Sequence, residues 1–219
     1  MGHWIHLDTP HGVISAWHSA PTGKPRAAIV VIQEIFGVNA HIRSVAEGFA
    51  REGYLTLAPA FFDVIEPHVE LDYDSTGVAR GRELIAGLGL DKALDITASA
   101  AEFIAEAGKV GSVGYCWGGT VALLAAVRLG LPSVSYYGAR NLSFLDESPK
   151  APVMFHFGER DDSIPPDMVA RHRESMPQMH TFTYPAGHGF NCDARADFDA
   201  DSANVARGRT LQFFSDHLA

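Results

Sequence analysis

Residues 27–32, Ala-Ala-Ile-Val-Val-Ile, form an unbroken apolar run that ends in four β-branched residues. Such a run is typical of a strand buried on both faces, and helices must then cover both sides of the sheet. Strand-like and helix-like segments alternate along the chain, which predicts an α/β fold with a mainly parallel sheet of about eight strands and helices on both faces. The other expected strands are residues 5–7, 13–17, 54–57, 110–115, 134–137, 153–157 and 181–184. The expected helices are residues 41–51, 78–88, 90–106, 118–129, 166–175 and 204–217.

The overall composition narrows the class of protein. A chain of 219 residues without an obvious break suits one domain over residues 1–219. The 17 basic and 26 acidic residues give a net charge of −9, which argues against nucleic acid or an anionic membrane as a partner. No apolar stretch approaches the roughly 20 residues of a membrane span, and residues 1–12 lack the features of a signal peptide. We therefore expect a cytoplasmic protein, and the net charge does not exclude a small anionic substrate, because a local arginine can override the global sign.

The segment from Gly114 to Gly119, Gly-Tyr-Cys-Trp-Gly-Gly, lies between an expected strand and an expected helix. It follows the nucleophile-elbow pattern G-x-S-x-G, with Cys116 in place of serine. The sharp turn needs small neighbours, which Gly114 and Gly118 supply, and the partial positive charge of the helix start favours a thiolate. The Trp117 amide would point to the same place and could stabilise an oxyanion. Cys116 is therefore the candidate nucleophile.

A thiol nucleophile needs a base and a group that orients the base. His188 stands between two glycines after the last expected strand, whereas His156 lies inside an apolar strand and is interpreted as a core residue. The loop after residues 153–157 offers Asp161, three residues beyond Gly158, as the preferred orienting acid, with its neighbour Asp162 as the rival. The chain order nucleophile, acid, base is that of the α/β-hydrolases, so an α/β-hydrolase fold is the specific expectation.

Other interpretations stay open at this point. Cys116 could be an inert buried thiol in a glycine-rich turn. The chain could also bind a ligand without turning it over, or act as a redox sensor in which Cys116 and Cys192 react with each other. A reducing compartment makes a structural disulfide between these two cysteines an unfavoured reading, and their spacing suits no metal.

The residues together resemble the dienelactone hydrolase (carboxymethylenebutenolidase) family. The resemblance rests on Gln33 to Asn39, Gln-Glu-Ile-Phe-Gly-Val-Asn, on the turn around Cys116, and on the Asp161 and His188 loops. It implies a Cys-His-Asp triad that opens a lactone or small ester, no metal or cofactor, and a monomer or weak homodimer. It also implies that Glu34 contacts the nucleophile, and that the Ile35 amide is the second oxyanion donor beside Trp117. Without the resemblance, Glu34 would be interpreted as a solvated loop residue.

The match to the family weakens at the substrate pocket. The family grips a substrate carboxylate with two arginines, and Cys192 stands where one of them would be, with Arg195 three residues later. Arg80 or Arg82 could match the other arginine, although each could equally be a charge on a solvent-facing helix. Family likeness also assigns Tyr137 to the pocket, and Phe36 and Phe190 could line it or belong to the core.

Overall fold

The computed structural model describes residues 2–218. The chain divides into two compact units, residues 2–112 together with Leu218, and residues 113–217. Each unit is described by itself below, and the single domain expected over residues 1–219 stays a prediction. No helix in the described part of the chain combines the length and the apolar character needed to cross a membrane.

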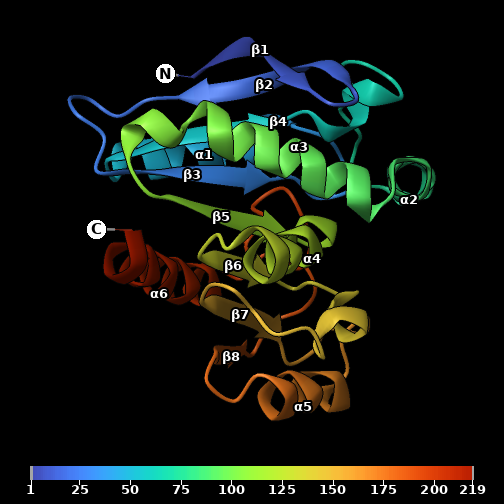
Figure 1. Ribbon diagram of the computed structural model, residues 1–219. Helices are drawn as coiled ribbons and strands as arrows, with labels where there is room; N and C mark the ends of the chain where they lie inside the picture. Colours follow the sequence, from blue (N-terminus) through green and yellow to red (C-terminus); the bar gives the residue numbers. More distant parts are fainter. Residues whose placement is uncertain (1, 219) are drawn as a thin grey trace. The chain divides into compact units, whose positions relative to one another are not determined.

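The first unit contains four strands in the order β1-β2-β4-β3 (Figure 1). β1 (His3–Thr9) and β2 (Gly12–Ser19) form an antiparallel hairpin, and β2 also pairs antiparallel with β4 (Tyr54–Pro59). β3 (Ala27–Ile32) runs parallel to β4. All six residues of β3 are buried, as its unbroken apolar sequence predicts.

Helices cover both faces of these strands. α1 (Ala40–Arg51) and α3 (Leu90–Phe103) pack on opposite sides of β3 and β4, with α3 in the foreground of Figure 1. α2 (Ser75–Leu88) begins three residues before the expected position, because the Asp74 carboxylate accepts the Gly77 N–H at 2.7 Å and caps the helix. The 3-10 helices of this unit are η1 (Phe61–Val64) and η2 (Ala105–Ala107).

The second unit has its strands in the order β5-β6-β7-β8. They are β5 (Val110–Tyr115), whose first half belongs to the other unit, β6 (Ser133–Tyr136), β7 (Val153–Gly158) and β8 (His180–Tyr184). β7 pairs parallel with both β6 and β8. The helices are α4 (Trp117–Leu124), which continues as the π-helical turn η3 (Ala125–Leu129), then η4 (Asn141–Phe144), α5 (Pro166–Ser175) and α6 (Ala200–Leu218).

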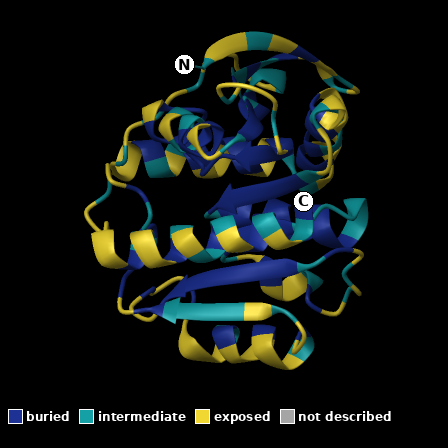
Figure 2. Ribbon diagram, turned by 90° about the vertical axis from the view of Figure 1, so that its left-hand side faces the viewer, coloured by how far each residue is buried: buried dark blue, intermediate teal, exposed yellow. Residues whose placement is uncertain are grey.

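Side chains of β7 alternate between α5 and α6. The rings of Phe155 and Phe157 lie 4.9 and 4.7 Å from the ring of His172 in α5. His156, which points the other way, contacts Thr210 of α6. The two helices therefore cover opposite faces of β7, and in Figure 2 this strand is dark blue whereas the half-buried edge strand β8 is teal.

Candidate active site

Cys116 stands at the sharp turn between β5 and α4. Its backbone has a φ of 55°, a left-handed conformation that side-chain-bearing residues seldom adopt. A side chain on Gly114 would overlap the Gly118 carbonyl oxygen, so the close approach of strand and helix requires glycine there. The Cys116 N–H donates to the Tyr136 carbonyl at 3.0 Å. The predicted elbow is therefore present, and it is anchored on the neighbouring strand β6.

The structure brings Cys116, His188 and Asp161 into one hydrogen-bonded line. His188 Nε2 lies 3.3 Å from Cys116 Sγ, and His188 Nδ1 lies 2.7 Å from Asp161 Oδ2. The Asp161 side chain is fully buried, and its other oxygen accepts the Ser163 N–H at 2.8 Å. Asp162 is exposed, so the geometry distinguishes between the two acidic candidates of this loop.

Backbone hydrogen bonds hold the Asp161 loop against the His188 loop. The Glu159 N–H donates to the Tyr184 carbonyl at 2.8 Å, and the Arg160 N–H donates to the Ala186 carbonyl at 3.0 Å. A Cβ on Gly158 would lie 2.5 Å from the Ala186 oxygen, so this close approach excludes a side chain. Both loops leave the carboxyl ends of adjacent parallel strands, β7 and β8, which is where ligands bind in α/β sheets.

Charge and burial act in opposite directions on His188. Burial, the largest single effect, lowers the pKa of the imidazole, but the hydrogen bonds to Asp161 and Cys116 and the charges of these two groups raise the pKa to about 10. At neutral pH the ring therefore carries both protons. Nδ1–H then donates to the Asp161 carboxylate, and Nε2–H points at the Cys116 sulfur.

A buried polar network lies behind this line, and the sequence did not reveal it. His156 Nδ1 contacts the Tyr184 hydroxyl at 2.8 Å, and His156 Nε2 contacts the Thr210 hydroxyl at 3.1 Å. The Thr210 hydroxyl lies 2.7 Å from the hydroxyl of Tyr136, whose carbonyl holds the Cys116 N–H. His156 is fully buried, as predicted. A histidine inside an apolar strand needs hydrogen-bond partners, and this was the sequence signal that could have indicated the network.

Of the other predicted pocket residues, Tyr137 packs beside His188 and Phe190 packs on Tyr137. Tyr137 has a φ of 39° and its ring lies 5.2 Å from the His188 ring. The Phe190 ring lies 5.5 Å from that of Tyr137, and both side chains are fully buried. Arg195 packs its guanidinium against Gly189, where a Cβ would lie 2.6 Å from Arg195 Cζ. Contact of any of these residues with substrate stays a prediction.

The other predicted residues belong to the first unit. Glu34 is 1 % exposed, so the alternative of a solvated loop residue is wrong for its position. Ile35 and Phe36 are also buried, and the ring of Phe36 lies 4.5 Å from that of Tyr73. Their roles toward a substrate remain predictions.

Arg80 was a candidate for binding a substrate carboxylate. In the first unit its guanidinium pairs with the carboxylates of Glu66 and Glu83, the latter at 2.8 Å. These two carboxylates neutralise the positive charge with which Arg80 would attract a substrate carboxylate. The alternative of a solvent-facing helix charge describes this environment, and substrate binding by Arg80 stays an untested prediction.

Known proteins resemble this chain along almost its whole length. A model of the dienelactone hydrolase family matches residues 14–218. The carboxymethylenebutenolidase of Pseudomonas putida is 30 % identical over 213 residues, with 90 % of this chain and 88 % of that protein covered. A Synechocystis sp. protein provisionally named as a carboxymethylenebutenolidase is 33 % identical over 214 residues, with 87 % and 86 % covered.

A solved structure agrees with the fold. The crystal structure of a provisionally assigned dienelactone hydrolase from Klebsiella pneumoniae superposes with a TM-score of 0.86 at 27 % identity, and covers 99 % of each chain. The expected α/β-hydrolase fold is thereby confirmed. With the family model spanning residues 14–218, these findings show that the chain belongs to the dienelactone hydrolase family.

Proposed function

We propose that this protein is a carboxylic-ester hydrolase that opens a lactone or small ester through the thiolate of Cys116. The observation that carries the proposal is the hydrogen-bonded line from Cys116 through His188 to Asp161. A nucleophile, a base within hydrogen-bond reach and a buried carboxylate that orients the base are the parts that nucleophilic acyl transfer requires.

In the first half of the reaction, the Cys116 thiolate attacks the substrate carbonyl and forms a carbon–sulfur bond. The carbonyl electron pair moves to oxygen, and its return breaks the bond to the alcohol oxygen. That oxygen takes the proton from His188 Nε2, which leaves a thioester on Cys116 and a neutral imidazole. Asp161 stabilises the imidazolium before transfer and keeps the Nε2 atom directed at the sulfur.

In the second half, neutral His188 removes a proton from water, and the resulting hydroxide attacks the thioester carbon. The carbon–sulfur bond breaks, and the thiolate–imidazolium pair is restored as the acid leaves. Trp117, the first residue of α4, would direct its amide at the oxyanion, and such donors are worth about 3–4 kcal/mol of barrier each. The Ile35 amide as a second donor and Glu34 as a contact of the nucleophile rest on the family resemblance.

The names of the relatives support a lactone as the substrate class. Carboxymethylenebutenolidases are named for opening a butenolide lactone, and we carry this class over to the present chain. Cys192 stands where the family has one of the two arginines that bind the substrate carboxylate. This favours a substrate other than one whose carboxylate is bound by both arginines. A cytoplasmic location, and a monomer or weak homodimer, remain part of this proposal.

The test is hydrolysis of p-nitrophenyl acetate and of small lactones by the wild type, by Cys116→Ala and by the matched control Cys192→Ala. We expect Cys116→Ala to lose activity, and intact-protein mass spectrometry to find an acyl adduct only where Cys116 is present. Full activity of Cys116→Ala would refute the proposal. Absence of both turnover and adduct in the wild type would favour ligand binding without catalysis, and a Cys116–Cys192 disulfide after peroxide treatment would favour redox sensing.

A further inference from the structure

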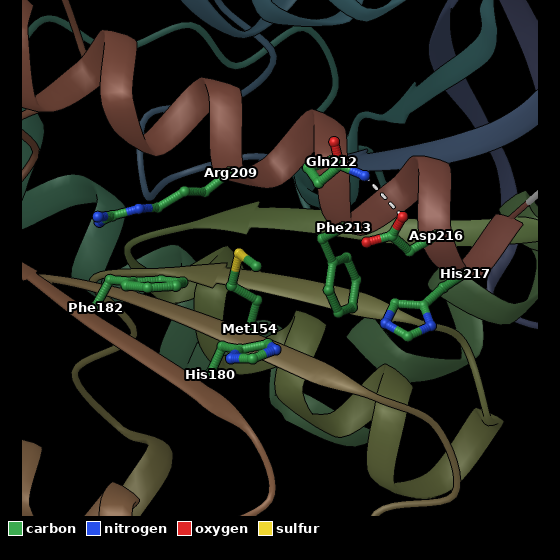
Figure 3. Close-up of a pocket in the computed structure, with 8 residues that line it drawn as sticks. All are labelled: Met154, His180, Phe182, Arg209, Gln212, Phe213, Asp216 and His217. Carbon is green, nitrogen blue, oxygen red and sulfur yellow. Dashed lines mark hydrogen bonds between the residues drawn. The ribbon is translucent and has the colours of Figure 1, made fainter.

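A pocket lies in the second unit, between helix α6 and the strands β7 and β8 (Figure 3). Its volume is about 220 Å³, which is smaller than a drug-sized site of roughly 300–1,000 Å³ and suits a small ligand. The lining residues come from these three elements and are Met154, His180, Phe182, Arg209, Gln212, Phe213, Asp216 and His217.

This pocket is separate from the Cys116–His188–Asp161 line. Met154 is the second residue of β7 and His180 is the first residue of β8, so the pocket lies at the amino ends of these strands. Asp161 and His188 follow the carboxyl ends of the same strands. From Met154 to Gly158 alone, the strand extends about 13 Å. A ligand in the α6 pocket therefore would not touch the reacting atoms.

The middle of the pocket is apolar. Met154 and Phe213 lie there between the strands and α6 in Figure 3, and Phe182 lies toward the Arg209 end. The rings of His180 and Phe182 are nearly parallel, with an interplanar angle of 14° and centroids 6.0 Å apart. Such a surface suits an aromatic or other flat apolar body.

Arg209 brings an uncompensated positive charge to one end of the pocket. Its guanidinium carbon lies 4.0 Å from the centroid of the Phe182 ring, and one nitrogen donates to the Tyr184 hydroxyl at 3.0 Å. Within residues 2–218, Arg209 forms no ion pair with a carboxylate. A half-buried guanidinium with spare donors and no acidic partner favours an anion with a planar, two-oxygen head.

The remaining polar groups fit the same ligand. Asp216 lies at the other end of the pocket, seven residues after Arg209, so that their Cα atoms are about 10.5 Å apart along the helix axis. Its carboxylate accepts from Gln212 Nε2 at 2.7 Å and forms no ion pair with Arg209 within the described residues. The imidazoles of His180 and His217 line the pocket and could donate hydrogen bonds to an anion.

We propose that the α6 pocket binds a small carboxylate carried on a flat apolar body. The carboxylate pairs with the guanidinium of Arg209, and the apolar body lies against Met154 and Phe213. This site is independent of the hydrolysis proposed above, because it shares no residue with the Cys116–His188–Asp161 line.

The probe is sodium benzoate, titrated into the full-length protein by calorimetry at pH 7 and followed by NMR of the histidine ring protons. We expect the His180 and His217 signals to shift and the His188 signals to stay. Arg209→Gln should weaken benzoate binding about ten- to hundredfold, the range of a lost charge-assisted hydrogen bond. Arg209→Lys should give an intermediate loss, because an ammonium cannot pair bidentately.

Two controls keep the proposal open to refutation. Gln212→Trp fills the mouth of the pocket from an exposed helix position, and should abolish benzoate binding even if Arg209→Gln does not fold. Arg171→Gln removes an exposed arginine of α5 that pairs with Glu174, and should leave the affinity unchanged. Equal binding of benzoate and neutral benzyl alcohol, unchanged binding in Gln212→Trp, or unshifted His180 and His217 signals would each overturn the proposal.

Discussion

The imidazoles of His188 and His156 belong to the same unit, yet their surroundings shift their pKa values in opposite directions. The pKa of His188 is raised to about 10, and the pKa of His156 is lowered to about 3. Both rings make two side-chain contacts of hydrogen-bond length. The number of contacts therefore does not explain the difference.

The chemistry of the partners explains it. Burial lowers the pKa of both rings, but His188 faces a carboxylate and a sulfur, which favour the charged form. His156 faces two hydroxyl groups, and the positive charge of Arg209 lowers its pKa further. At neutral pH His188 is therefore protonated and has a proton to give, whereas His156 is a neutral group.

Removing the charged ring should have the largest effect. We expect His188→Gln to lower kcat/KM for p-nitrophenyl acetate roughly 10³–10⁴-fold, because no group then takes or returns the proton. His6→Gln, at an exposed position of β1, is the control and should keep wild-type activity. Comparable activity of the two variants would show that His188 has no part in the reaction.

Removing only the charge of its partner tests why His188 differs from His156. In Asp161→Asn the amide keeps the shape but not the charge, so burial should dominate and the pKa of His188 should fall from about 10 toward 6.5 or below. We expect a roughly 10²–10³-fold loss of kcat/KM at pH 7. NMR titration of the His188 ring measures the shift directly, and a pKa that stays near 10 would contradict this account.

The buried neutral imidazole of His156 should make the protein less stable as the pH falls. Because the pKa of His156 is lowered to about 3, and burial lowers that of His172 to about 4, both take up a proton only on unfolding once the pH is below 6.5. The free energy of unfolding should fall as pH drops from 6.5, by about 1.4 kcal/mol per pH unit for each ring. Urea unfolding at pH 7, 6 and 5 measures the slope, and His156→Gln should reduce it by about half.

His188 should affect the free energy of unfolding at alkaline pH, which urea unfolding between pH 6.5 and pH 10 measures. Its raised pKa means that its contribution to stability is complete below pH 6.5 and is lost as the pH rises toward 10. The stability difference between wild type and His188→Gln should therefore shrink over that interval. A constant difference from pH 6.5 to pH 10 would argue against a protonated ring in the folded state.

The smallest effect is expected for one hydroxyl of the neutral network. Tyr184→Phe leaves His156 Nδ1 without its partner, and should cost about 1–3 kcal/mol of unfolding free energy. A double-mutant cycle with His156→Phe tests the assignment. The double variant should lose less than the sum of the two single losses, and additive losses would mean that the two groups are not coupled.

The sequence predicted what depends on local pattern. The run at residues 27–32 became a strand buried on both faces, and the glycines around Cys116 formed the expected turn. The starts of two helices were less well predicted. Helix α2, capped by Asp74, begins three residues before its expected first residue, and α6, which follows Asp199, begins four residues early. Those caps were readable from the sequence.

Long-range pairing could not be predicted in the same way. The burial of Glu34, the pairing of Arg80 with Glu66, and the hydroxyl partners of His156 each depend on segments distant in sequence. Periodicity and composition carry no information about such partners. Asp161 was preferred to Asp162 from its place in the loop, and the coordinates add the contact itself, Asp161 Oδ2 at 2.7 Å from His188 Nδ1, which no local pattern gives.

The left-handed backbone at Cys116 means that the residue best suited to the proposed reaction is not the one that would be most stable there. Glycine would relax that conformation, which costs a residue with a side chain of order 1–3 kcal/mol. A selection for heat resistance alone would therefore drift toward Cys116→Gly and remove the sulfur proposed as the nucleophile. Thermostabilisation campaigns on this scaffold should hold residue 116 fixed and look for their gains elsewhere.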